Sequence, residues 1–79
     1  MDSYQLKVFC TVAKLQSFSK AAKALHMSQP AVSAHIKQLE ELYQGALFER
    51  TPQGAYLTKA GEVFYDYAQK ILALFSEMQ

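Results

Sequence analysis

The chain has 79 residues, of which 51% are hydrophobic and 19% are charged, with three glycines and two prolines. This composition excludes disordered and collagen-like chains, and the length leaves room for one compact core and a binding module but little room for a catalytic cleft. The net charge is only +1, but residues 1–39 hold five lysines and one aspartate whereas residues 40–79 hold three basic and six acidic residues, so the first half is the better candidate for contact with a polyanion.

The first two predicted elements are helices. Residues 4–15 place apolar side chains at helical spacing, which predicts a helix with one buried stripe. The predicted stripe consists of Leu6, Phe9, Cys10 and Ala13. Residues 20–25 are rich in good helix formers, and the hydroxyl groups of residues 17–19 can cap a short second helix there. This second helix should end near His26 and Met27, where a favourable contact with the helix dipole explains the histidine.

A third helix is predicted to begin near Gln29, because Ser28 can cap it and Pro30 falls in its first turn. Two helices joined by so few residues form a helix-turn-helix. The side chains expected to pack inward are Val32, Ile36, Leu39 and Tyr43. Those expected to point outward are Pro30, Ala34 and Lys37, with Gln29 and Ser33 on one flank. This outward face is small, polar and free of carboxylates, which suits close approach to the major groove of DNA.

The next segment predicts a β-hairpin. The third helix should stop at Gly45, and residues 46–50 and 55–57 are predicted to be short strands around the turn Thr51-Pro52-Gln53-Gly54. Such a hairpin is the wing of a winged helix. Thr58 is then a good N-cap for a last helix, with Glu62 favourably placed in its first turn.

The last helix is apolar around more than half of its circumference. One stripe, with the spacing of a coiled-coil seam, consists of Ala60, Phe64, Tyr67, Ile71, Leu74 and Met78. A second stripe consists of Val63, Ala68, Leu72 and Phe75. The first part of this helix can pack on its own domain, but the rest requires a partner helix, so a homodimer is expected.

The predicted fold class is mainly α: a winged helix-turn-helix, with a three-helix core plus a β-hairpin wing, over residues 1–58, followed by a long linker and dimerisation helix over residues 59–79 in the same structural unit. The single cysteine, Cys10, allows no internal disulfide and favours a reducing compartment. The sequence shows neither a membrane span nor a signal peptide, so a cytoplasmic protein without membrane contact is expected.

Other kinds of site find little support. Cys10, His26 and His35 lack the paired spacing of a zinc site, and no serine has a histidine and a carboxylate at motif spacing. We therefore expect no metal, no cofactor and no catalytic residue. Two alternatives to DNA binding are a helical protein–protein interaction module whose last helix recruits a partner, and RNA binding, for which an aromatic platform and a glycine-rich clamp are missing.

The pattern as a whole resembles the N-terminal domain of LysR-type bacterial transcriptional regulators. The residues that carry the resemblance are Ser17-Phe18-Ser19, Ala21-Ala22, Leu25, Ser28-Gln29-Pro30-Ala31-Val32-Ser33, Ile36, Leu39-Glu40, Leu47-Phe48, Arg50, Leu57-Thr58 and Gly61. The resemblance implies a winged helix-turn-helix with a dimerising linker helix, and a larger effector-binding domain that this chain does not contain.

The resemblance also implies roles for individual residues. Those expected to face base edges are Gln29, Pro30, Ser33 and Ala34. Those expected to hold phosphates are Ser17, Ser28, Lys37, Arg50 and Thr58. Gln53 and Gly54 would reach the minor groove from the wing tip. From the apolar stripes of the last helix, the residues expected at the dimer interface are Phe64, Tyr67, Ile71, Leu74, Phe75 and Met78.

Three positions depart from the pattern of the family. Gln16 stands where glycine is usual, Ala34 where a longer polar residue is common, and Gln53 where arginine is frequent. Ala34 is left with apolar contacts such as a thymine methyl group, and Gln53 predicts a weaker electrostatic attraction to the minor groove than an arginine would give.

Two copies paired through the last helix would bind a roughly palindromic double-stranded site.

Overall fold

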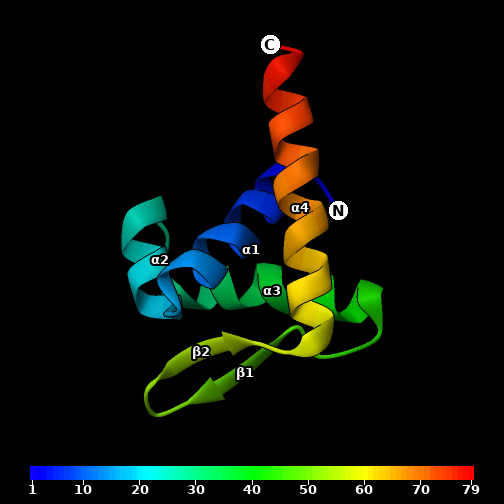
Figure 1. Cartoon of the computed structure of the whole chain (residues 1–79). Helices are drawn as coiled ribbons and strands as arrows, with labels where there is room; N and C mark the ends of the chain where they lie inside the picture. Colours follow the sequence, from blue (N-terminus) through cyan, green and yellow to red (C-terminus); the bar gives the residue numbers. More distant parts are fainter.

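The computed structural model describes residues 1–79 and contains four helices and one antiparallel hairpin (Figure 1). The elements are α1 (Ser3–Leu15), α2 (Phe18–Leu25), α3 (Gln29–Tyr43), β1 (Phe48–Thr51), β2 (Gly54–Leu57) and α4 (Lys59–Glu77). The predicted fold class, a three-helix core with a wing and a long last helix, is confirmed.

Three helices begin at the hydroxyl caps that the sequence predicts. The side-chain oxygens of Ser17, Ser28 and Thr58 accept backbone N–H groups at 3.0, 3.2 and 3.0 Å. Each bond satisfies one of the N–H groups that a helix start leaves without an intrahelical partner. The starts of α2, α3 and α4 are therefore fixed by local sequence.

The first three helices end on residues other than glycine in the left-handed conformation. Gln16, His26 and Gln44 have φ values of 55°, 55° and 65°. The conformation closes each helix, because the N–H of the cap donates to a carbonyl of the last turn. His26 thus has a backbone role in addition to the dipole contact expected from the sequence. Gln16 does more, since its carbonyl accepts the N–H of Ala55 at 3.0 Å and ties the wing to the end of α1.

Replacing Gln16 by glycine is expected to stabilise the fold. A side chain in the left-handed region costs about 1–2 kcal/mol, part of which is offset by the greater backbone entropy of unfolded glycine, so Gln16→Gly should raise the free energy of unfolding by roughly 0.5–1 kcal/mol. Urea unfolding followed by circular dichroism measures this change. The control is Gln69→Gly on the exposed side of α4, which should lose about 1 kcal/mol. Equal losses in both variants would contradict the prediction.

Helix α1 lies at the centre of the core and packs against α2, α3, α4 and β2. Its fully buried side chains include Val8, Phe9 and Val12, whereas Cys10 and Ala13 of the predicted stripe are only partly buried. The buried face of α1 therefore includes Leu6 and Phe9 of the predicted stripe but also Val8 and Val12. It is broader than one apolar repeat indicates because α1 has neighbours on several sides. Burial raises the pKa of the Cys10 thiol to about 11. The other core side chains are Leu6, Phe18, Ala21, Ala22, Val32, Ile36, Leu39, Leu47, Phe48, Ala55 and Ala68.

Tyr43 corrects the predicted inward face of the third helix. Val32, Ile36 and Leu39 are buried as expected, but Tyr43 is 46% exposed. It occupies the last position of α3, and its ring meets the edge of Phe64, with 6.1 Å between centroids. The last turn of α3 extends beyond the helices that bury its earlier turns (Figure 1).

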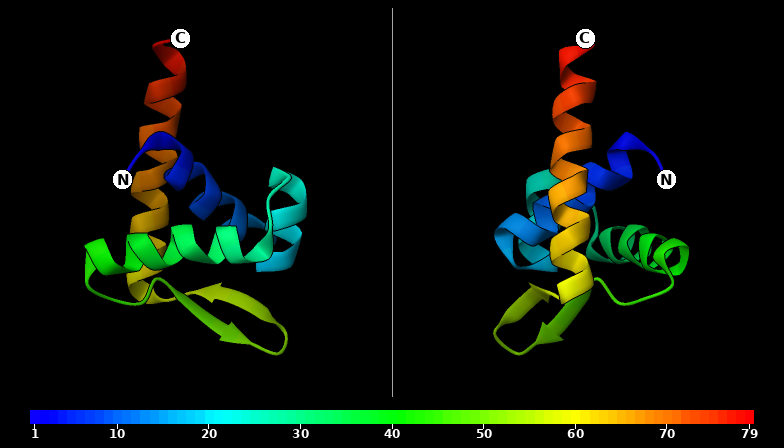
Figure 2. Two further views of the ribbon diagram at one scale, coloured as in Figure 1. Left: turned by 180° about the vertical axis from the view of Figure 1, so that it is seen from behind. Right: turned by 45° about the vertical axis from the view of Figure 1, so that its right-hand side comes forward.

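Helix α4 also divides its apolar residues differently from the prediction. Phe64, Ala68 and Leu72 pack against the core, and the ring centroids of Phe64 and Phe9 are 4.8 Å apart. The large side chains left exposed are Val63, Tyr67, Ile71, Leu74, Phe75 and Met78, which we call the exposed α4 stripe. Each predicted stripe therefore has some residues in the core and others exposed. The buried side of α4 is the side that faces α1, and the spacing of apolar residues in α4 does not indicate where α1 lies. The C-terminal half of α4 projects away from the other elements in all three views (Figures 1 and 2).

None of the helices has the length and hydropathy needed to span a bilayer.

Candidate nucleic-acid interface

The outer side of α3 is exposed and lies next to the wing (Figure 2). Gln29, Pro30, Ala34 and Lys37 are exposed, and Ser33 is half-buried on the flank of this face. We call these five residues the outer α3 face. None of them carries a carboxylate, and Ala34 gives the face a small centre. The structure therefore exposes four of the five residues of the surface that the helical spacing predicts, and covers Ser33 in part.

Two clefts flank the outer α3 face, and Arg50 borders both. The first lies between the wing and the starts of α2 and α3, and is lined by Ser17, Phe18, Ser19, Gln29, Arg50, Thr51, Gly54 and Ala55. The second is lined by Phe18, Ser33, Ile36, Lys37, Glu40, Phe48 and Arg50. Residues predicted for base and phosphate contacts thus come together from the N-cap of α2, from α3 and from β1.

Arg50 joins these elements because of its position in β1. Side chains alternate between the two faces of a strand, so Arg50 shares the inward side of the wing with the buried Phe48. Its Cζ lies 3.5 Å from the ring centroid of Phe18, the first residue of α2. Its Nη2 donates a hydrogen bond to Ser33 Oγ in α3 at 2.9 Å. One side chain of the wing therefore contacts both helices of the helix-turn-helix.

The wing tip is held by local hydrogen bonds. The backbone N–H of Gln53 donates to Thr51 Oγ1 at 3.1 Å, and its carbonyl accepts from the Tyr56 hydroxyl at 3.3 Å. The side chain of Gln53 is exposed at the tip. Gly54 has a φ of 148°, and a Cβ there would lie 2.7 Å from the carbonyl oxygen of Gln16. Only glycine permits this approach of the wing to the end of α1.

Thr58 lies apart from the two clefts, at the start of α4. Its hydroxyl accepts from the N–H of Gly61 and donates to the carbonyl of Ala46 at 2.8 Å. Both bonds are internal to the domain. The predicted contact of Thr58 with a phosphate stays a prediction.

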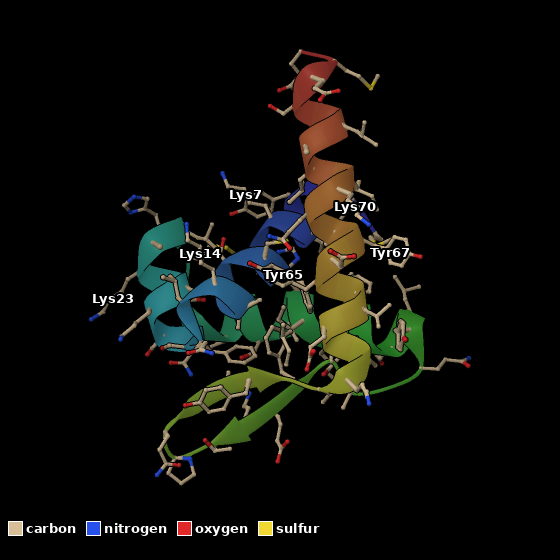
Figure 3. All side chains as sticks on the ribbon, viewed as in Figure 1. Lys7, Lys14, Lys23, Tyr65, Tyr67 and Lys70 are labelled. Atoms are coloured by element: carbon tan, nitrogen blue, oxygen red, sulfur yellow. The ribbon has the colours of Figure 1, made fainter.

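The basic residues of the first half are spread over the molecule. Figure 3 shows Lys7, Lys14 and Lys23 on α1 and α2, away from the wing. Lys20 lines a third cleft, together with the wing-tip residues. Lys37 lines the second cleft, together with Ser33 and Arg50. Counting charges along the chain therefore overstates the positive charge near the outer α3 face.

Sequence reasoning missed the role of Glu40. Its Oε2 accepts the backbone N–H groups of Leu47 at 2.7 Å and Phe48 at 3.3 Å, so the end of α3 holds the chain that enters β1. Glu40 is part of the family pattern, as are Leu47 and Phe48. Its position shortly before them in the sequence was the available signal for this contact. The stacking of Arg50 on Phe18 was also missed, although the alternation of β1 could have indicated the inward direction of Arg50.

The sequence matches a known family along most of its length. Residues 3–62 match the family described as bacterial regulatory helix-turn-helix protein, lysR family. The HTH-type transcriptional regulator BudR of Klebsiella aerogenes is 50% identical over 74 residues, which cover 94% of this chain and 52% of BudR. A probable RuBisCO transcriptional regulator of Cyanidioschyzon merolae is 48% identical over 73 residues, covering 92% of this chain and 24% of that protein. The chain therefore spans about a quarter of one of these relatives and about half of the other.

Solved structures are similar to almost the entire chain. CbnR, a LysR family transcriptional regulator, matches with a TM-score of 0.94 and 38% identity over 99% of this chain and 27% of CbnR. The BenM_DBD/catB site 1 DNA complex matches with a TM-score of 0.94 and 38% identity, over 99% of this chain and 87% of that one. Proteins with this arrangement of helices and wing thus include one solved with DNA.

Proposed function

The chain belongs to the LysR family of bacterial regulatory helix-turn-helix proteins, and on that premise we propose that it binds double-stranded DNA sequence-specifically, as a homodimer, with α3 in the major groove. The wing would lie at the adjacent minor groove, where Gln53 and Gly54 form its tip. The site would be roughly palindromic, because the twofold symmetry of a dimer is matched by two half-sites.

The observation that carries this proposal is the outer α3 face. The major groove is about 12 Å wide and accepts one α-helix of similar diameter. Close entry requires short side chains and no carboxylates, since the phosphates repel negative charge. Pro30, Ser33 and Ala34 are short, no residue of the outer α3 face carries a carboxylate, and the wing stands beside it. The solved DNA complex of a structurally similar domain supports the same reading.

The individual contacts are part of the proposal. Gln29 would pair with an adenine edge, and Pro30, Ser33 and Ala34 would contact neighbouring bases. The residues proposed for phosphate contacts are Ser17, Ser28, Lys37, Arg50 and Thr58. The dimer would form through α4. The similarity to transcriptional regulators further supports a role without catalysis in the bacterial cytoplasm, with an effector domain attached in the full-length protein.

The alternative is a protein–protein interaction module, which the exposed α4 stripe would also serve. Titrating the chain with random DNA duplex, a duplex selected from a random library and RNA, each at two salt concentrations, separates the two functions. DNA binding predicts tighter binding to the selected duplex and a steep loss of affinity with salt. Binding to none of the three nucleic acids would exclude the proposed function.

The first variant to test is Gln29→Ala. Loss of a bidentate contact with a base should cost about 1–3 kcal/mol on the selected duplex and much less on random DNA. Binding isotherms on both duplexes measure the difference. Equal losses on the two would show that Gln29 does not read a base.

The matched variant is Lys37→Ala, on the same helix face. A phosphate contact carries no sequence information, so its loss should weaken binding to all duplexes alike and reduce the salt slope by about one. The slope of log K against log salt concentration measures this change. An unchanged slope would remove Lys37 from the phosphate contacts.

A further inference from the structure

The contact between Arg50 and Ser33 constrains what the serine can do. A serine hydroxyl offers one donor hydrogen and two acceptor positions. Arg50 Nη2 donates to Ser33 Oγ at 2.9 Å, so the guanidinium uses one acceptor position and leaves the hydroxyl proton available. Arg50 is held in place by its stacking on the Phe18 ring, which is 6% exposed. The arrangement is therefore built into the domain before any ligand binds.

The charge of Arg50 also acts on whatever approaches Ser33. A hydroxyl that accepts a hydrogen bond from a cation is polarised and becomes a better donor. An amino group that approached the second acceptor position would bring positive hydrogens next to the guanidinium, which is unfavourable. An oxygen or ring nitrogen would be attracted by the same charge. The environment of Ser33 thus favours acceptors over donors.

We propose that Arg50 is a positioning residue that fixes Ser33 as a hydrogen-bond donor, so that this position reads guanine or thymine and rejects cytosine. In the major groove guanine presents O6 and N7 and thymine presents O4, all acceptors, whereas cytosine presents only its N4 amino group and adenine presents an amino group beside its acceptor N7. The inference rests on the proposed function and deepens it, because it names the kind of base edge that Ser33 recognises. Other N–H groups of Arg50 stay available for a phosphate.

The test selects duplexes from a random library with the wild-type chain and then measures binding to the selected duplex with each base substituted. The wild type should show one position where guanine or thymine is preferred over cytosine by about five- to tenfold, the effect of one hydrogen bond. Ser33→Ala should lose the preference at this position only. Arg50→Met, which keeps an apolar stem for Phe18, should lose it at the same position.

A double-mutant cycle distinguishes positioning from independent contacts. If Arg50 acts through Ser33, adding Arg50→Met to Ser33→Ala changes the preference at that position no further. A direct contact of Arg50 with the same base would give additive losses and would overturn the proposal. A role limited to phosphate would weaken all duplexes equally and leave the preference intact, which would also overturn it. Lys37→Ala is the control, expected to lower affinity while keeping the preference.

Further measurements distinguish a variant that does not fold, failure of the proposed function and failure of this inference. Circular dichroism establishes whether Arg50→Met folds. If it does not fold, Arg50→Lys decides by the same criterion, since an ammonium keeps the charge but lacks the planar fork that stacks on Phe18 and reaches Ser33. A wild-type chain that selects no sequence would overturn the proposed function as well. A clear selection in which no position responds to Ser33→Ala would overturn this inference and the proposed base contact of Ser33, and would leave sequence-specific DNA binding intact.

Discussion

The variant Gly61→Ala is expected to lose about 3 kcal/mol or more of folding stability, at or beyond the upper end of ordinary overpacking. A Cβ at Gly61 would lie 2.0 Å from the carbonyl oxygen of Leu47 and 3.0 Å from its carbonyl carbon. Both atoms belong to the backbone, so no side-chain rotation can relieve the clash. The same carbonyl accepts the N–H of Thr58 at 3.0 Å, which fixes it against the start of α4. Thermal unfolding followed by circular dichroism should show a midpoint lower by roughly 12 °C or more.

The control for this prediction is Gly45→Ala. A Cβ at Gly45 would meet only ring atoms of Tyr43, at 3.7 and 4.0 Å, which is ordinary van der Waals contact. The two variants make the same chemical change, so the difference between their midpoints reports the closeness of α4 to the chain before β1. Similar midpoints for both would show that α4 can move away from Leu47 without loss.

The order of the elements and the starts of three helices follow from local signals in the sequence. Ser17, Ser28 and Thr58 begin helices because their hydroxyl groups accept N–H groups three residues later, a contact that requires no other part of the fold. The turn Thr51-Pro52-Gln53-Gly54 likewise specifies the hairpin, which pairs Thr51 with Gly54. These elements could be predicted because nearby residues determine them.

The choice of buried face could be predicted only in part. Val32, Ile36 and Leu39 are buried as the helical spacing indicates, because α3 has a single apolar side in its first turns. Helix α4 is apolar on two adjoining sides, and spacing alone cannot decide which side meets α1. Phe64, which was predicted at the dimer interface, therefore packs against the core, while Val63 of the second stripe is exposed.

Long-range polar contacts were the least predictable part of the candidate site. Arg50 reaches Ser33 across 17 positions of sequence, and Glu40 reaches Phe48 across eight. Neither pairing follows from a periodicity. Each depends on the angle at which the wing returns to the helices, which is set by the tertiary packing of Phe48 and Leu47 in the core.

The exposed α4 stripe covers one side of a helix whose C-terminal half projects from the domain. Its large apolar side chains include Tyr67, Ile71 and Leu74, which are 62%, 44% and 62% exposed. Lys70 Nζ lies 5.6 Å from the ring centroid of Tyr67 (Figure 3), and the other residues of the stripe are exposed. Exposure of such an apolar surface to water is unfavourable. We therefore propose that α4 of a second copy packs against the exposed α4 stripe in a homodimer.

Leu74→Glu should therefore weaken the proposed dimer by about 100-fold or more, which corresponds to about 3 kcal/mol, because two unpaired carboxylates would be buried at the twofold contact. The monomer should keep its stability, since Leu74 is already 62% exposed there. Sedimentation equilibrium measures dimerisation, and affinity for a palindromic duplex should fall with it because the two half-sites are no longer linked. Ala73→Glu, an exposed neighbour outside the stripe, is the control and should leave both quantities close to wild type. A Leu74→Glu protein that still dimerises would place the contact elsewhere on the chain.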